Sequence, residues 1–300
     1  MPLLIWVFIF IVLGMILIYL IVGGIAALTM TKIGDHPQYD NTPATFGLDF
    51  QTVQFLSRID QKKISAWYIP GLKAERCILM VHGRNASKQN AISGKLPELA
   101  SKLHQTGFAV LMIDLRGHGE SEGKRYTYGE HERRDVLGGV DFLLDRGFQP
   151  GNIAVLGISL GGAAAVGAAV REDAIGALIL DSTFADLIEL VEPHWVVESR
   201  LPMFFLWGAY VMWQVFYGFD LKKVKPVEDV TRITPRPILI MHSSSDEMID
   251  VSQAHQMAKA VPSATLVIFD DCDHAELYRD APEKYLDAVI PFLHKAWEAG

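Results

Sequence analysis

The chain has 300 residues, of which 35 are acidic and 27 basic, so its net charge is −8. This charge disfavours nucleic acid as a partner, because phosphate backbones attract basic surfaces. Two cysteines, Cys77 and Cys272, are too few for a disulfide framework and lack the spacing of a metal site, so we expect two free thiols. After the apolar N-terminal segment about 270 residues remain, enough for one large α/β domain.

The N-terminal segment is apolar from Leu3 to Leu28, which is 26 residues without a charge. A helix rises 1.5 Å per residue, so this length crosses a hydrocarbon core of about 30 Å. We therefore predict that residues 1–30 form a single transmembrane anchor. The alternative is a cleaved signal peptide, but a basic start and a clear cleavage site are both missing. Lys32 is the only basic residue close to either end, so the sequence does not assign a side of the membrane to the rest of the chain.

Residues 31–49 read as a linker, because two prolines, Pro37 and Pro43, occur there among polar residues. We expect the catalytic domain to cover residues 50–300. Its first two β-like runs, at 50–56 and 64–69, are separated by a charged turn. They predict an antiparallel hairpin at one edge of a sheet.

Buried strands alternate with helices through the rest of the domain. The apolar runs at 76–81 and 108–113 are typical of parallel strands covered on both faces, and residues 87–105 predict the crossover helix between them. Further strands are expected at 177–180, 237–241 and 265–269, and further helices at 133–146, 252–261 and 282–296. This alternation predicts an α/β fold with a doubly wound, mostly parallel sheet of about eight strands.

The stretch NIAVLGISLGGAAAVGAAV, residues 152–170, has Ser159 at its centre. An apolar run leads into Gly157-Ile158-Ser159-Leu160-Gly161, and small residues with helical character follow it. A strand, a sharp turn and a helix in this order predict a nucleophile elbow, with a mere glycine-rich turn as the alternative. A serine at this position excludes the aspartate nucleophile that epoxide hydrolases and dehalogenases use.

A serine hydroxyl needs an imidazole to take its proton, and the imidazole needs a carboxylate to hold its tautomer. In a fold of this kind the chain order is serine, acid, histidine. Among the histidines after Ser159, His274 alone sits just beyond the last predicted strand, in a turn-rich acidic loop, whereas His294 falls on a predicted helix. Asp246 lies in the loop after strand 237–241 and is the expected acid. Asp181, at the end of the strand 177–180, is the rival candidate.

Attack by the serine creates an oxyanion, which needs hydrogen-bond donors aimed at the developing charge. We expect the backbone N–H groups of Leu160, next to the nucleophile, and of Arg84, directly after His82-Gly83, to supply them. The chain contains no nucleotide-binding glycine motif, no P-loop, no H-E-x-x-H and no paired cysteine ligands. No cofactor is therefore expected.

About fifty residues, roughly 183–233, separate two sheet strands, more than a single crossover helix needs. They include LPMFFLWGAYVMWQVFYGF, residues 201–219, which is uncharged and rich in aromatic side chains. We predict an inserted lid over the strand ends. The alternative is a larger packed helix pair whose aromatic residues are ordinary core.

Five motifs carry a resemblance to a known family. They are HGRN at 82–85, DLRGHGES at 114–121, GISLG at 157–161, SSSDE at 243–247 and DCDHAE at 271–276. Together and in this order they resemble the serine α/β-hydrolase superfamily, in its esterase, lipase and peptidase-like branch with a short HG oxyanion loop. The resemblance implies the α/β-hydrolase fold and an acyl-transfer hydrolase with a Ser-Asp-His triad, but it implies no particular substrate.

The expected function is that of a membrane-anchored serine hydrolase, which cleaves carboxylic esters, including lipid-like ones, through an acyl-enzyme. Aminopeptidase-like or thioesterase activity on the same triad is the first alternative, since these bonds pass through the same tetrahedral chemistry. A non-catalytic binding protein on the hydrolase scaffold is the second. The expected partners are a small-molecule or lipid-like acyl substrate and, through the N-terminal helix, a membrane; the oligomeric state is not encoded. The aromatic segment would line an acyl pocket or contact the membrane interface.

Overall fold

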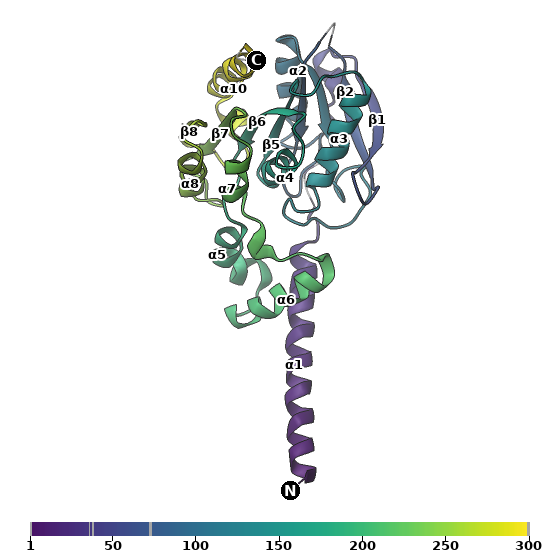
Figure 1. The fold of residues 1–300 in the computed structure, drawn as a ribbon, viewed down its shortest axis with the longest axis vertical. Helices are drawn as coiled ribbons and strands as arrows, with labels where there is room; N and C mark the ends of the chain where they lie inside the picture. The colour runs from purple at the N-terminus through teal and green to yellow at the C-terminus, as the bar shows by residue number, and fades with distance from the viewer. Residues whose placement is uncertain (1, 36, 38, 72–73, 299–300) are drawn as a thin grey trace. The chain divides into compact units, whose positions relative to one another are not determined.

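The computed structural model describes residues 2–35, 37, 39–71 and 74–298 of the chain (Figure 1). His36 and Gln38 of the predicted linker lie outside the described residues. The chain divides into two compact units, which we treat separately. The first, the helical unit, comprises Met1–Lys32 and Leu187–Val224, and the second, the hydrolase unit, comprises Ile33–Asp186 and Lys225–Gly300.

The hydrolase unit is built on one eight-stranded sheet with the strand order β1-β2-β4-β3-β5-β6-β7-β8. Its strands are β1 Gln51–Leu56, β2 Lys63–Ile69, β3 Cys77–Val81, β4 Ala109–Ile113, β5 Ile153–Ile158, β6 Ile175–Asp181, β7 Ile238–Ser243 and β8 Thr265–Phe269. The pairs β1–β2 and β2–β4 are antiparallel, and all other neighbours are parallel. The structure thus confirms the predicted mostly parallel sheet with an antiparallel hairpin at one edge.

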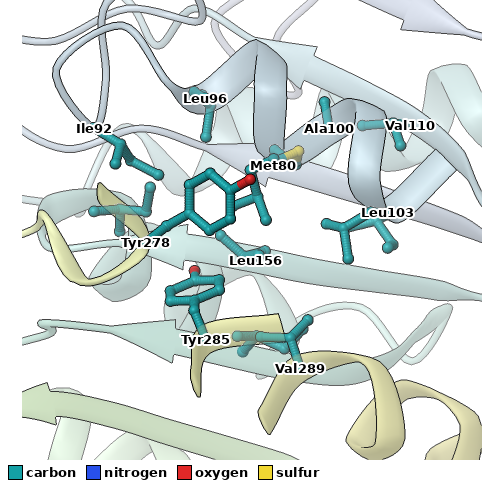
Figure 2. Packing of buried hydrophobic residues seen from close by; sticks show 14 of the residues in the cluster. Met80, Ile92, Leu96, Ala100, Leu103, Val110, Leu156, Tyr278, Tyr285 and Val289 are labelled. Carbon is teal, nitrogen blue, oxygen red and sulfur yellow. The ribbon is translucent and has the colours of Figure 1, made fainter. Parts of the chain in front are cut away.

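Helices cover both faces of this sheet, so strands β3 to β6 are buried on both sides. On one face, Leu96, Ala100 and Leu103 of α2 pack with Tyr285 and Val289 of α10 over Met80 and Leu156 of the central strands (Figure 2). On the other face, Gly139 of α3 lies against the side chain of Leu79. The helices of this unit are α2 Leu96–Gln105, α3 Arg133–Asp145, α4 Leu160–Ala169, α7 Pro226–Asp229, α8 Ser252–Ala260, α9 Leu277–Asp280 and α10 Pro282–Glu298, with short 3-10 turns η1 Pro43–Phe46 and η4 Val230–Arg232.

The crossover helix is shorter than the sequence predicts. It begins at Leu96, and residues 87–95 form turns in which Ile92, Ser93 and Gly94 have positive φ. Local side chains explain the difference. The Ser87 N–H donates to the Asn90 amide oxygen (2.6 Å), and the Asn90 N–H donates to the Ser87 hydroxyl (3.3 Å). Such short-range bonds offer the backbone an alternative to the helix.

The helical unit contains α1 Pro2–Met30, α5 Leu187–Ser199, α6 Leu206–Tyr217 and two 3-10 turns, η2 Met203–Phe205 and η3 Leu221–Lys223. In length and composition, Leu3–Met30 of α1 is able to cross a membrane. Helix α6 packs beside the C-terminal half of α1 (Figure 1). The middle of the long insertion therefore forms one compact body with the N-terminal helix, an association that no local sequence pattern indicates.

Candidate active site

Ser159 lies in the turn between β5 and α4, with φ 53° and ψ −115°, a conformation that L-residues rarely adopt. The flanking glycines permit it. A Cβ atom on Gly157 would lie 2.5 Å from the Gly161 carbonyl oxygen, and one on Gly161 would lie 2.4 Å from the Val81 carbonyl oxygen. Both contacts are too short for any side chain, so the strand and the helix meet this closely only because both residues are glycine.

The structure brings Ser159, His274 and Asp246 together. The His274 Nε2 atom is 3.0 Å from the Ser159 hydroxyl, and its Nδ1 atom is 2.7 Å from Asp246 Oδ2. The three residues follow β5, β8 and β7, whose carboxyl ends meet at one edge of the parallel sheet. In this arrangement Nδ1–H donates to the carboxylate, which leaves Nε2 to accept the serine proton.

The Asp246 carboxylate is fixed by its own loop. Its Oδ1 atom accepts hydrogen bonds from the backbone N–H groups of Met248 (2.9 Å) and Ile249 (2.8 Å). Burial raises the pKa of Asp246, but hydrogen bonds from His242 and His274 outweigh burial and hold that pKa well below its usual range. The carboxylate is therefore ionised at neutral pH and able to stabilise a protonated imidazole.

His242 is a contact of the acid that the sequence did not indicate. Its Nε2 atom is 2.8 Å from the Ile249 carbonyl oxygen and 3.3 Å from Asp246 Oδ2. Burial lowers the pKa of His242, but the hydrogen bonds to Asp246 and the Ile249 carbonyl outweigh burial and raise it. The one signal in the sequence is spacing, because His242 directly follows the predicted strand 237–241 and lies four residues before Asp246.

Asp181, the rival acid, lies at the end of β6 and is fully buried. Its Oδ1 atom accepts a hydrogen bond from the Ser182 hydroxyl (2.9 Å), and its backbone carbonyl accepts one from the Ser159 N–H (2.7 Å). The His274 Nδ1 atom bonds to Asp246 instead. Burial raises the pKa of Asp181 to about 6, so this carboxyl favours its neutral form more than an exposed one does.

The expected oxyanion loop passes close to the nucleophile, since a Cβ atom on Gly83 would lie 3.3 Å from the Ser159 Cβ atom. Histidines brace this loop. The His82 Nδ1 atom is 2.8 Å from the Gly83 carbonyl oxygen, and the Leu115 N–H donates to His82 Nε2 (3.0 Å). The Asn85 N–H donates to His118 Nε2 (3.3 Å). Loops 82–85 and 114–118 therefore hold each other in place.

The two expected oxyanion donors border Ser159 from different directions. Leu160 begins α4 directly after the serine, and Arg84 follows Gly83 in the braced loop. The Arg84 guanidinium donates to the Tyr126 hydroxyl (3.4 Å). A cavity of about 270 Å³ opens at this point, and its lining includes Gly83, Arg84, Asn85, Ser159, Met248 and His274. Ser159 and His274 thus lie on one cavity wall together with Arg84, whereas Leu160 is not part of the lining.

The comparison with known protein families agrees with the fold and the motifs. Residues 78–288 match the model of the alpha/beta hydrolase family. The chain belongs to this family. Among curated relatives, the alpha/beta hydrolase domain-containing protein WAV2 of Arabidopsis thaliana is 26% identical over 266 residues, 86% of this chain and 82% of that protein. The uncharacterized protein YqkD of Bacillus subtilis is 28% identical over 238 residues, 77% of this chain and 75% of that protein.

Solved structures give the same alpha/beta hydrolase fold. The esterase Pf2001 of Pyrococcus furiosus superposes with a TM-score of 0.71 at 21% identity, over 88% of this chain and 98% of that one. The esterase RhEst1 of a Rhodococcus species superposes with a TM-score of 0.58 at 18% identity, over 81% of this chain and 98% of that one. At these identities the likeness concerns the fold alone.

Proposed function

We propose that this chain is a membrane-anchored serine hydrolase that cleaves carboxylic esters through an acyl-enzyme. The observation that carries the proposal is the continuous chain of hydrogen-bonding distances from Ser159 through His274 to Asp246, at the mouth of a cavity. Several solved structures of the same fold are named esterases, which supports an ester as the substrate.

In the proposed reaction, the Ser159 oxygen attacks the ester carbonyl carbon while His274 Nε2 takes the hydroxyl proton. The Leu160 and Arg84 N–H groups stabilise the oxyanion. When the carbon–oxygen bond to the alcohol breaks, His274 returns the proton to the leaving oxygen. Water then attacks the acyl-serine by the same route, and His274 again acts first as base and then as acid. Asp246 holds the imidazole and stabilises its protonated form.

A fluorophosphonate probe tests the catalytic part of the proposal, because it reacts covalently with an activated serine. The full chain should become labelled, and Ser159→Ala should abolish labelling. Ser263→Ala, which removes an exposed hydroxyl ahead of β8, is the matched control and should keep it. Absence of labelling in the unmodified chain would contradict the enzyme assignment. Matched ester, thioester and amide substrates then identify the bond that is cleaved.

Retention of α1 as an anchor is supported by its packing against α6. Gly208, Ala209 and Trp213 of α6 are buried in the unit that includes α1. A cleaved signal peptide would leave this apolar face without its covering helix, at a cost of about 25 cal/mol for each Å² exposed. The mass of the mature membrane-extracted protein checks the point, since retention predicts the full chain from the N-terminal segment onward.

A further inference from the structure

One face of α6 and the turn before it carries exposed apolar side chains. At the start of this face, the Phe204 ring also contacts the Tyr19 ring of α1, with the ring centroids 4.8 Å apart. The members of this face are Phe204, Trp207, Val211 and Val215, whose side chains are between 52% and 69% exposed. They recur every three or four residues, the interval that places side chains on one side of a helix. We call these four residues the outer α6 face. Exposed apolar side chains gathered on one face of a helix are a feature of interaction sites.

The opposite face of α6 is occupied by α1 through very small residues. A Cβ atom on Gly23 would lie 2.4 Å from the Gly208 carbonyl carbon, so the two backbones nearly touch. A Cβ atom on the neighbouring Gly24 would lie 3.3 Å from the Phe216 ring. Close backbone approach through glycine is typical of helix packing inside membranes, where van der Waals contact rather than expulsion of water holds helices together.

Two tyrosine hydroxyls in this seam have hydrogen-bond partners within the protein. The Tyr19 hydroxyl donates to the Phe204 carbonyl (2.8 Å) and accepts from the Gly208 N–H (2.9 Å). At the other end of α6, the Thr31 and Tyr217 hydroxyls are 2.6 Å apart. The first N–H groups of a helix have no partner inside the helix, and in water the solvent satisfies them. A tyrosine in that role suits a place from which water is excluded.

The charges of this segment lie at its ends. Leu201 to Phe219 contains no charged residue, whereas Lys222 and Lys223 follow in η3. The Lys222 ammonium lies 4.0 Å from the centroid of the Trp207 ring. An indole ring beside an exposed ammonium has one apolar and one polar side, as side chains have at the boundary between acyl chains and headgroups.

The length of α1 sets the depth of α6. The 28 residues Leu3–Met30 extend about 42 Å, which exceeds the roughly 30 Å hydrocarbon core and matches a bilayer with its headgroups. The part of α1 that carries α6 is its C-terminal half, so α6 comes to lie near one boundary of the core. The exposed side chains of Ile18, Ile21 and Ile25 make the surface of α1 apolar at the same level.

We propose that the outer α6 face lies in the boundary between headgroups and acyl chains of the leaflet from which the C-terminal end of α1 emerges. The lipid bilayer is the partner, and α1 and α6 enter it as one packed unit. The inference rests on that part of the proposed function which keeps α1 as an anchor. It assigns the aromatic insertion to membrane contact through α1, in addition to any role over the active site.

The test places an environment-sensitive fluorophore at single cysteines of the full chain in phosphatidylcholine vesicles. In a background with the buried Cys77 and Cys272 replaced by alanine, Val211→Cys and Val215→Cys report on the outer α6 face. Ile11→Cys in α1 is the control for the anchor. Ile59→Cys, exposed in the hydrolase unit, is the control for a position in water.

We expect blue-shifted emission at positions 211 and 215 and at least about twofold quenching by lipids that carry bromine on their acyl chains, as at position 11. Position 59 should show neither. Quenching at 11 but not at 211 and 215 overturns the inference and leaves the anchor intact. A blue shift without quenching at 211 and 215 means that a second copy or another protein covers the face, which also overturns it. Absence of quenching at 11 removes the anchor and the inference together, whereas fluorophosphonate labelling reports separately on the enzyme.

Discussion

The Asp246 carboxylate is the residue on which the proposed base depends. In Asp246→Asn the amide oxygen keeps the two backbone hydrogen bonds that Oδ1 accepts, so the amide NH₂ group faces His274 Nδ1 and donates to it. The imidazole then carries its proton on Nε2, which is no longer free to accept the serine proton. We expect kcat for an ester to fall by on the order of 10³–10⁴ while the fold is retained. Asp181→Asn is the control and should stay within about tenfold of the unmodified chain. A crippling effect of Asp181→Asn instead would identify it as the acid.

The buried carboxyl of Asp181 should make stability depend on pH. The pKa of Asp181 is about 6 in the folded protein, against 3.8 for an unperturbed aspartate. As the pH rises, the unfolded chain therefore loses this proton at a lower pH than the folded chain does. Stability contributed by the neutral form is complete below pH 4 and is lost as pH rises through 6. Asp181→Asn abolishes this loss, so its stability relative to the unmodified chain should rise by up to about 3 kcal/mol between pH 4 and pH 7. Thermal unfolding of both proteins in one detergent at pH 4 and pH 7 measures this change in stability. A stability difference between the two proteins that does not vary with pH would contradict the prediction.

At the scale of residues, the sequence pointed to Ser159, Asp246 and His274 because each follows a recognisable strand and carries chemistry that the others need. These are the residues that the structure brings within hydrogen-bonding distance. Their catalytic roles remain predictions. His242 could not be found in this way, because its contact with Asp246 depends on how the chain turns between residues 243 and 249, and no periodicity encodes that turn.

At the scale of elements, the contact between α1 and α6 depends on one glycine. Gly23→Ala places a methyl group against the Gly208 backbone, where no side chain is able to move aside, so the helices must separate. We expect overpacking to cost about 1–3 kcal/mol. Local opening should then speed tryptic cleavage after the exposed Arg200, between α5 and α6, by about fivefold or more. Gly14→Ala in the same helix is the control, since nothing lies within 4 Å of its Cβ position. Equal cleavage rates for the two variants would exclude a tight seam.

The elements of the sheet were the most predictable part of the chain. Each of the eight strands is a continuous or alternating apolar run that ends at turn residues, so local pattern and tertiary role agree. The crossover helix was predicted too long, because side-chain bonds within residues 87–95 override a pattern that permits a helix. The apolar pattern of α6 indicates that it is covered, but its covering helix lies 185 residues away in sequence, as the Tyr19–Phe204 pair shows. Local patterns do not identify partners at that distance.

At the scale of the whole molecule, the membrane should act on the choice of substrate rather than on the chemistry. A domain tethered to a bilayer meets amphiphilic esters at a higher effective concentration than the same domain in solution. A chain that begins at Asp35 lacks the anchor. It should hydrolyse a water-soluble short-chain ester at a rate similar to that of the full chain, and should lose most of its activity on a long-chain ester held in vesicles.

The truncation at Asp35 also uncovers the buried face of α6, so a second truncation separates the two effects. A chain that begins at Tyr19 retains the residues of α1 that pack against α6 but lacks the exposed span Leu3–Ile18. If tethering is the cause, both truncated chains should lose activity on the vesicle ester and keep it on the soluble one. If lipid contact through α6 is enough, the chain from Tyr19 should keep part of its activity on vesicles, in proportion to the apolar area that still enters the bilayer. Equal rates of all three proteins on both esters would show that the membrane segment only localises the enzyme.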